Sequence, residues 1–347
     1  MRTSPSILGM HAGSFGSIGS KTMMSRFLTF LIFALSAAGF VESRAWAQPY
    51  PSKPLKIVAP FPPGSTIDLS ARLIGAKMSE RLGQPVIVEN RVGAGGVIGA
   101  TLVARAAADG YTLLFTTPST HVIAFFFSKN LPYDPIKDFT PITAAMDSFQ
   151  GLAVGTAVPV GSLQELVEYA KSNPGKLTYG SAGMGTEFHL AGELFKKAAG
   201  VDILHVPYKS AAQALPGTAA GQISMTFSTV SSQLPFMRSG KVRIVGILNT
   251  NRYPGLPDVP TITEIVPAFD KPPAWQGFFG PAELPRPIVL RLNAEIKAAL
   301  GTPDVRRTLD GNGQRAIANS PEEFLAMIKK GLEATGHAIK AAGIKVE

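Results

Sequence analysis

The chain has 347 residues, of which 45% are hydrophobic and 16% are charged, a balance that excludes a disordered chain and indicates a globular one with a large core. It contains no cysteine, which excludes disulfide bridges, thiolate nucleophiles and cysteine-ligated metals. The net charge of +9 is spread along the sequence without a run of five like charges, so the composition gives little support to nucleic-acid binding.

The N-terminal segment has the order of a signal peptide. Basic residues precede an apolar run at 27–40, which is shorter than the roughly 20 residues that a membrane-spanning helix needs. An Ala-Trp-Ala motif of the kind that marks a cleavage site then ends at Ala47. We therefore expect residues 1–47 to be removed by cleavage after Ala47 and the mature protein to be soluble and exported. The translation start stays open among three methionines, Met1, Met23 and Met24.

After this segment, strand and helix patterns alternate. Three short β-rich runs are separated by two helical patterns. In chain order these elements are expected at 55–59, 68–82, 86–88, 97–108 and 111–116. In the first helix Leu69, Leu73 and Ala76 share a face, which we expect to pack on the core. Strands that alternate with helices predict a parallel sheet covered by helices on both faces.

The same alternation returns later in the chain. Ser162 and Glu165 have the spacing of a capping box and predict a helix that runs to about Ser172. A second helical pattern carries Glu193 and Lys197 at i,i+4 spacing, which predicts an ion pair. The further strands are expected at 177–180, 203–206, 223–227 and 242–248, and the further helices at 187–199, at 288–300 and after Ser320.

Two α/β units in one chain predict two lobes. Extended apolar segments at 139–156 and 274–281 carry no helix signal, and we interpret them as strands that cross between the lobes. The first lobe would then comprise residues 48–148 and 280–347, and the second would comprise residues 149–279. Lobes joined in this way enclose a cleft with a hinge, where small ligands bind.

Two loops of this chain can present backbone N–H groups to an anion. Residues 61–68 join the first strand to the first helix, where Gly64 allows a tight turn and Ser65 or Asp68 should cap the helix. Residues 180–190 form a similar Gly/Ser/Thr-rich loop in the second half. Two helix starts that face each other across a cleft can bind a carboxylate through amides and helix dipoles. Either loop taken alone is also explained as a turn with a cap.

Other motifs give weaker signals. Residues 93–99 miss the dinucleotide-binding glycine pattern by one position, and residues 180–183 do not fit the nucleophile motif G-x-S-x-G. The histidines are scattered and the sequence has no H-E-x-x-H, so we expect no cofactor and no metal. We also expect no enzyme activity. The alternative is a periplasmic hydrolase or isomerase that uses His189 with Ser181 or Glu187, although no activated nucleophile has the spacing that such chemistry needs.

With these loops identified, the chain from Tyr50 to the C-terminus resembles the receptors of tripartite tricarboxylate transporters, the Bug family of periplasmic solute-binding proteins. Seven short motifs occur in the order of that family. They begin at Phe61, Val88, Ala108, Gly180, His205, Leu256 and Ser320. The resemblance implies an α/β, two-lobed periplasmic binding protein fold (type II-like) and a carboxylate ligand between the lobes. It also implies a membrane permease as the partner; we expect the receptor to be a monomer.

Carried onto this chain, the ligand contacts of the family fall in both lobes. In the first lobe they are Phe61, Pro63, Gly64, Ser65, Thr66, Asp68, Thr117 and Ser119. In the second lobe they are Ser181, Gly185, Thr186, His189, Tyr208, Phe227 and Thr229. Glu187 departs from the family pattern and would repel an anionic ligand unless its side chain points outward. A simple dicarboxylate is therefore less favoured, and an amide, an aromatic acid or a monocarboxylate fits as well.

Overall fold

The computed structural model describes residues 50–344, and the expected signal peptide and its cleavage site lie outside them. The strands are β1 (Leu55–Ala59), β2 (Val86–Asn90), β3 (Thr112–Thr116), β4 (Phe139–Ser148), β5 (Gln150–Gly155), β6 (Leu177–Ser181), β7 (Ile203–Pro207), β8 (Met225–Thr229), β9 (Val242–Ile247), β10 (Gln276–Pro281) and β11 (Gln314–Ala316). The helices are α2 (Thr66–Leu82), η1 (Ala94–Gly96), α3 (Val97–Ala104), η2 (Ser119–Ile123), α4 (Ala124–Phe127), α5 (Leu163–Ser172), α6 (Glu187–Ala199), α7 (Ala211–Ala219), α8 (Val230–Arg238), α9 (Ile262–Ile265), α10 (Arg286–Leu300), α11 (Pro303–Gly311) and α12 (Pro321–Ala342).

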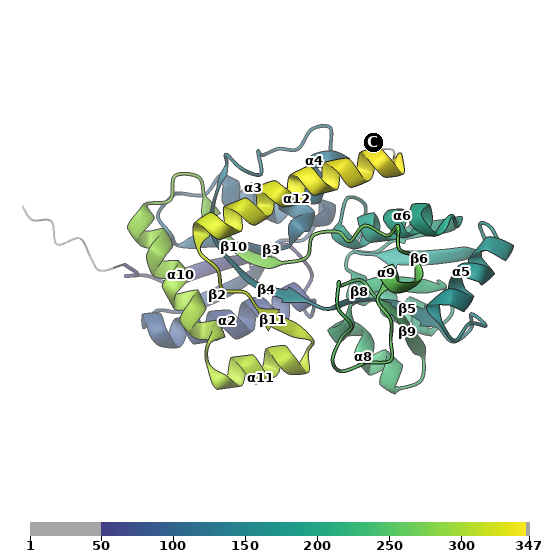
Figure 1. The fold of residues 1–347 in the computed structure, drawn as a ribbon. Coiled ribbons are helices and arrows are strands. Elements are labelled where there is room, and N and C mark those ends of the chain that lie inside the picture. Colours follow the sequence, from purple (N-terminus) through teal and green to yellow (C-terminus); the bar gives the residue numbers. More distant parts are fainter. Residues whose placement is uncertain (1–49, 345–347) are drawn as a thin grey trace, which may run out of the picture. The chain divides into compact units, whose positions relative to one another are not determined.

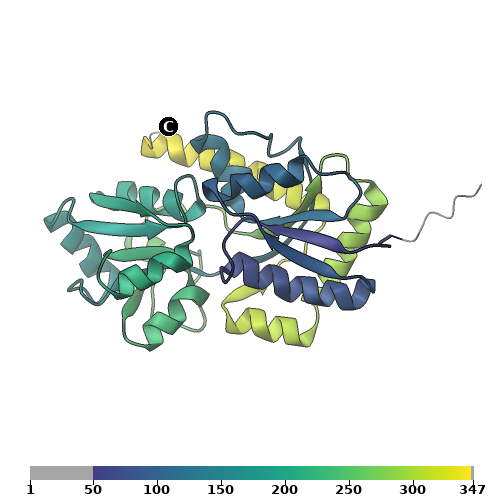
Figure 2. The same ribbon diagram turned by 180° about the vertical axis from the view of Figure 1, so that it is seen from behind.

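The strands of residues 50–344 form two separate sheets with helices on their faces (Figures 1 and 2). The first sheet has the order β11-β4-β10-β3-β1-β2, and the second has the order β7-β6-β8-β5-β9. The predicted parallel pairing is confirmed for β1 with β2 and β3, and for β6 with β7 and β8. Both sheets are nevertheless mixed, because β4, β5, β9, β10 and β11 pair antiparallel.

The chain passes from the first sheet to the second through a single residue, Phe149, which lies between β4 and β5. Its N–H donates to the carbonyl of Gly313 at 2.8 Å, and its carbonyl accepts from the N–H of Val230 at 2.8 Å. This agrees with a crossing strand over 139–156. The second crossing segment differs from the expectation, which placed it at 274–281. All of β10 pairs within the first sheet, so the chain crosses back through the segment between β9 and β10.

The C-terminal helices pack on the first sheet, as expected from the predicted return of the chain. Helices α10 and α12 both contact β4, and α12 also contacts α6 of the second sheet (Figure 1). Helix α12 begins with the capping box that the sequence predicts, in which Ser320 accepts from the N–H of Glu323 and Glu323 accepts from the N–H of Ser320.

The predicted buried face of α2 is correct only at Leu73, which is partly buried and packs on the core. Leu69 is 59% exposed and Ala76 is exposed, whereas the helix buries Ile67, Ala71, Ile74 and Met78. Apolar residues occur on more than one side of this helix. The buried set follows i, i+4, i+7 and i+11, which is the longer of the two apolar stripes and the one that meets the sheet.

Three further details differ from the sequence-based expectation. Helices α7 and α8 lie in segments for which no helix was expected, and each contains an internal proline, Pro216 or Pro235. Such a proline normally argues against a helix. In α6, Glu193 pairs with Lys196 at 3.1 Å and not with Lys197, so the predicted i,i+4 ion pair is an i,i+3 pair.

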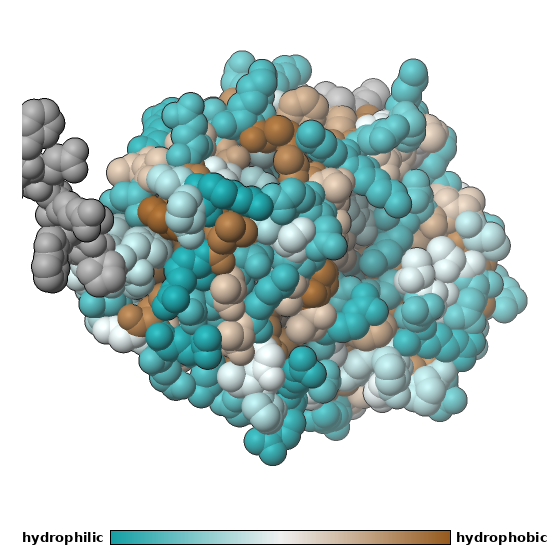
Figure 3. All heavy atoms as spheres, turned by 60° about the vertical axis from the view of Figure 1, so that its left-hand side comes forward, coloured by the Kyte–Doolittle hydropathy of each residue, from teal (hydrophilic) through white to brown (hydrophobic). Residues whose placement is uncertain are grey.

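Several large hydrophobic residues are exposed, among them Leu69, Ile87 and Ile98. On the face drawn in Figure 3 hydrophobic residues form small patches surrounded by hydrophilic residues. Within residues 50–344, no helix combines the length and the apolar character that crossing a bilayer requires.

Candidate ligand-binding site

A small cavity lies where the two sheets face each other. Its walls come from loops and helix starts of both sheets. The lining residues are Phe61, Ser65, Thr66, Ile67, Thr117, Ser119, Ala182, Glu187, Phe188, Ser210, Ala211, Ala212, Thr229, Ser232 and Gln276. The space left for the centres of water-sized molecules is about 60 Å³, which corresponds to a few waters. The structure is therefore a closed form of the two lobes.

Two hydrogen bonds hold the lobes together at this cavity. The hydroxyl of Thr66 at the start of α2 lies 3.0 Å from the hydroxyl of Thr229, where β8 ends and α8 follows. The N–H of Glu187 at the start of α6 donates to Oγ of Ser119 at 3.2 Å. Each bond joins a residue of the first sheet's lobe to one of the second, so closure brings these four residues into direct contact.

Four helix starts converge on the cavity. Helices α2, α6, α7 and α8 begin after Ser65, Thr186, Ser210 and Thr229, and each helix places residues of its first turn in the cavity wall. The first N–H groups of a helix have no partner within the helix and carry its positive dipole end. Four such ends around one space favour an anion there.

Two of these helix caps, and Thr117 before η2, keep a hydroxyl hydrogen that no hydrogen bond within residues 50–344 uses. Ser65 Oγ accepts from the N–H of Asp68, and Ser210 Oγ accepts from the N–H of Gln213, both at 3.3 Å. Thr117 Oγ1 accepts from the N–H of Ser119 at 3.2 Å. A hydroxyl oxygen that accepts in this way keeps its own O–H for another acceptor. The cavity wall thus offers several hydroxyl donors to a bound carboxylate.

Gln276 and Glu187 also line the cavity. Gln276, which is 4% exposed, donates through Nε2 to Ser148 Oγ at 2.8 Å, while its Oε1 has no hydrogen-bond partner among residues 50–344. Glu187 is 7% exposed. Burial raises the pKa of Glu187 to about 8, and the charge of Lys271 opposes that rise. At neutral pH the Glu187 carboxyl is therefore largely protonated in the empty cavity.

The first-lobe predictions divide into two groups. Phe61, Ser65, Thr66, Thr117 and Ser119 line the cavity, and Thr229 joins them from the second lobe. Pro63, Gly64 and Asp68 do not line it. Ser65 is the cap of α2, whereas Asp68 points back toward the loop.

Asp68 supports the loop and does not face the cavity. Its carboxylate accepts from the Gly64 N–H, from Arg72 and from Asn90, each at 2.9 Å. Burial acts to raise the pKa of Asp68, but these hydrogen bonds outweigh it and hold the pKa below its ordinary value. Asn90 also donates to the Phe61 carbonyl, so the same cluster fixes the loop against β2.

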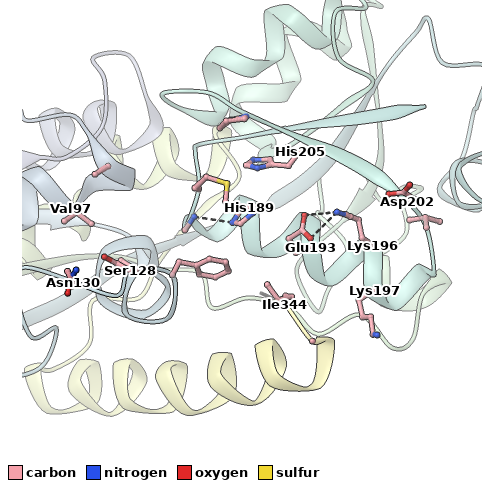
Figure 4. A pocket seen from close by; sticks show the side chains of 18 of the residues that line it. Val97, Ser128, Asn130, His189, Glu193, Lys196, Lys197, Asp202, His205 and Ile344 are labelled. Carbon is pink, nitrogen blue, oxygen red and sulfur yellow. Dashed lines mark hydrogen bonds and ion pairs between the residues drawn. The ribbon is translucent and has the colours of Figure 1, made fainter. Parts of the chain in front are cut away.

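Most of the second-lobe predictions lie elsewhere. Phe227 is in the core, and Tyr208 lines a separate hollow together with Gly183. Gly185 and His189 line a larger, more open groove (Figure 4), which also contains Glu193, Lys196 and His205. Thr186 is fully buried and caps α6 by accepting from the N–H of His189. None of these predicted residues of the second lobe lines the closed cavity.

The residues of the enzyme alternative, Ser181, Glu187 and His189, lie in different surroundings. Ser181 is fully buried, and its Oγ lies 2.6 Å from Nε2 of His205. Nδ1 of His189 accepts from the Gly185 N–H at 3.2 Å, and Glu187 faces the other cavity. Burial, followed by the charge of His189, lowers the pKa of His205 to about 4.

Sequence reasoning missed several lining residues. They are Ile67, Ala182, Phe188, Ser210, Ala211, Ala212, Ser232 and Gln276. Ser210 and Gln213 have the spacing of a helix cap, which could have revealed the start of α7. No local sequence pattern marks Gln276 as a lining residue, because it is the pairing of β10 with distant strands that brings it to the cavity. Within the described residues, no group of acidic or histidine side chains is arranged to hold a metal ion.

Two mixed sheets with helices on their faces, joined by crossing segments and closed over a small cavity, define a periplasmic binding protein fold. The family model of the tripartite tricarboxylate transporter family receptor matches residues 70–344. BugT of Bordetella pertussis is 30% identical over 326 residues, which are 93% of this chain and 99% of BugT. The chain therefore belongs to the tripartite tricarboxylate transporter receptor family, which includes the Bug proteins, and it is a solute-binding receptor.

Solved structures of relatives share the fold. A protein of R. palustris with adipate has a TM-score of 0.81 and 34% identity, covering 85% of this chain and 98% of that protein. MatC from Rhodopseudomonas palustris with bound malate has a TM-score of 0.79 and 34% identity, covering 84% and 100%. These similarities agree with the predicted fold class and family.

Proposed function

We propose that this chain is exported, binds a small organic acid between its lobes and delivers it to a membrane permease of the tripartite tricarboxylate type. The observation that carries this proposal is the convergence of the α2, α6, α7 and α8 helix starts on one enclosed cavity. Helix N–H groups and hydroxyls are the donors that a carboxylate needs. Relatives that carry adipate or malate support the ligand class.

Binding and closure are coupled in this proposal. The bonds of Thr66 with Thr229 and of Glu187 with Ser119 exist only when the lobes are close. A ligand that contacts both lobes stabilises the closed form relative to the open one. The permease then meets a receptor whose outer surface differs between the empty and the loaded state, with no covalent step.

A screen of small carboxylates against the mature protein tests ligand binding. We expect a subset to raise the melting temperature, because a ligand that binds only the folded chain stabilises it. Small-angle scattering with and without such a ligand measures closure. If no carboxylate binds and the scattering profile never changes, the receptor proposal is wrong. Turnover of a bound acid that is lost in His189→Ala would instead support the enzyme alternative.

Export is tested separately. Periplasmic extracts of cells that express the full chain should contain a protein whose N-terminus is Gln48 by mass spectrometry. A protein that still carries residues 1–47 and stays inside the cell would contradict the proposed export and the cleavage after Ala47.

A further inference from the structure

Two buried nitrogen atoms lie without a hydrogen-bond partner where the chain crosses back to the first sheet. They are Nε2 of His121 and Nε1 of Trp275, and neither has a partner among residues 50–344. His121 is completely buried and Trp275 is 3% exposed, so water does not reach these atoms in the closed form. A buried polar group without a partner costs the folded chain free energy, so the two atoms require an explanation.

His121 is fixed within the first lobe. It lies in η2, a π-helix that begins at Ser119, the residue whose Oγ accepts the bond from Glu187 across the lobes. Its ring stacks on Phe279 of β10 with the ring centroids 3.8 Å apart, and its Nδ1 lies 2.8 Å from Oγ1 of Thr120. Short π-helical turns are rare and occur mostly at functional sites. The contacts of the ring therefore hold Nε2 in place without satisfying it.

Trp275 belongs to the return segment, residues 248–275, which carries the chain from β9 back to β10. Its ring centroid lies 6.5 Å from that of His121, with the rings edge to face, and 5.0 Å from that of Phe324 on α12. Segments that cross between lobes absorb the rotation when the lobes move. We therefore expect a rotation of the lobes to change the position of Trp275 relative to His121.

The two nitrogens have complementary hydrogen-bonding chemistry. An indole Nε1–H can only donate. Nε2 of His121 accepts when the ring proton is on Nδ1, where Oγ1 of Thr120 accepts it. Burial lowers the pKa of His121 to about 3, so the ring is neutral at physiological pH and keeps one nitrogen unprotonated. The closed form contains a donor and an acceptor in neighbouring rings that do not bond to each other.

We propose that these two nitrogens favour the open form of the empty receptor. The N–H group of Trp275 donates a hydrogen bond, to His121 or to water, when the lobes part, and loses that bond when they close. A ligand must offset this loss before the closed form is favoured. The inference rests on the proposed function, because it assumes that the lobes open and close. It makes ligand affinity depend on two residues that do not line the cavity.

Removal of the unpaired N–H group should tighten ligand binding. Trp275→Phe keeps an aromatic ring against Phe324, and the closed form loses no hydrogen bond by this change. The open form loses one, so a carboxylate that binds the wild-type protein should bind the variant about three- to thirtyfold more tightly in calorimetry. A variant whose packing is damaged would bind more weakly. Unchanged or weakened affinity would therefore overturn the inference.

Tyr133→Phe is the matched control for this variant. The Tyr133 ring lies in the same aromatic cluster, 6.3 Å from that of His121, but its hydroxyl is paired and donates to the Thr120 carbonyl at 2.7 Å. Loss of a paired hydroxyl should lower the stability of the chain without tightening ligand binding. Equal tightening in Tyr133→Phe and Trp275→Phe would attribute the effect to a loosened cluster and would contradict the role of the unpaired nitrogens.

The wild-type protein offers a spectroscopic readout that needs no variant. The full sequence contains two tryptophans, Trp46 and Trp275, and the expected cleavage after Ala47 removes the first. The ultraviolet resonance Raman spectrum of the mature protein then reports the hydrogen bond of one indole N–H group. We expect this bond in the empty protein and its loss when a ligand is bound. The same hydrogen-bonding state with and without ligand would show that the inference is wrong.

Small-angle scattering separates this inference from the proposed function. Without any ligand, Trp275→Phe should be more compact than the wild-type protein, because its open form has lost a hydrogen bond. If carboxylates close the wild-type protein but Trp275→Phe changes neither the compactness nor the affinity, the inference is wrong and the receptor proposal stands. If the wild-type protein binds no carboxylate and the empty variant keeps the wild-type profile, both are wrong.

Discussion

The hydroxyl groups of Thr66 and Thr229 lie 3.0 Å apart although 163 residues separate them in the sequence. The pair joins the start of α2 in one lobe to the end of β8 in the other. Both residues line the cavity, so the same two side chains stabilise the closed state and form part of the candidate binding site.

Removing this bond should favour the open form. Thr66→Val keeps the shape of the side chain and removes one hydroxyl, which should cost the closed state about 1 kcal/mol and weaken ligand binding about fivefold. Calorimetry with a carboxylate that binds the wild-type protein measures the effect. Thr308→Val, on the exposed side of α11, is the control and should bind as the wild-type protein does. Unchanged affinity in Thr66→Val would show that the bond does not contribute to closure.

A negative charge at the start of α2 should oppose an anionic ligand. Ser65→Asp and Ser65→Asn both retain a side chain that caps a helix, but only the first adds a charge beside the cavity. We expect Ser65→Asp to weaken carboxylate binding at least tenfold relative to Ser65→Asn. Titration of both variants with the same carboxylate gives the ratio, and equal affinities would argue that the carboxylate binds elsewhere.

The buried Glu187 should make the stability of the empty protein depend on pH. Burial raises its pKa from 4.5 to about 8. Between these values the folded chain holds a proton that the unfolded chain releases, so the free energy of unfolding falls as the pH rises through this window. Above about pH 8 the carboxyl is ionised in both states and the decline ends. Lys271 opposes the shift and moderates the decline.

Denaturant unfolding of the wild-type protein and Glu187→Gln between pH 5 and pH 8.5 tests this sign. The wild-type curve should fall more steeply, by up to about 1.4 kcal/mol per pH unit. The lowered pKa of His205 acts in the opposite direction at acid pH, but it is common to both proteins and cancels in the difference. Parallel curves would show that Glu187 ionises normally.

The contact between α6 and β6 should tolerate no added methyl group at Gly192. A Cβ atom there would overlap the ring of Tyr179, which is fully buried. Gly192→Ala should therefore lower the free energy of unfolding by about 1–3 kcal/mol. Gly311→Ala is the control, because a Cβ atom there meets nothing within 4 Å. Denaturant melts of the two variants compare them, and equal stabilities would mean that Tyr179 moves aside without cost.

The strands were the most predictable part of the fold. Short β-rich runs bounded by turn residues placed β1, β2, β3, β6 and β7 to within a few residues. Helices α7 and α8 were not predictable by the same reasoning, because Pro216 and Pro235 lie inside them and tertiary contacts outweigh the local preference. The buried face of α2 was ambiguous for a related reason, since apolar residues occur on both sides of it.

The site was predictable where it follows a strand. Ser65, Thr66, Thr117, Ser119 and Thr229 lie just after β1, β3 or at the end of β8, and strand ends are recognisable in a sequence. The second-lobe glycine loop was also recognisable.

The orientation of that loop was not predictable, because the pairing of Ser181 with His205 turns its hydroxyl into the lobe. Gln276 reaches the cavity through a pairing between distant strands, which no local pattern encodes.

Helix α12 touches both β4 and α6, so it rests on the element that carries Glu187 while being anchored to the opposite sheet. If the second lobe rotates when a ligand binds, as the proposed function requires, α6 shifts along α12 at the surface of the molecule. The proposed permease would then distinguish the loaded receptor from the empty one by the relative position of these two helices.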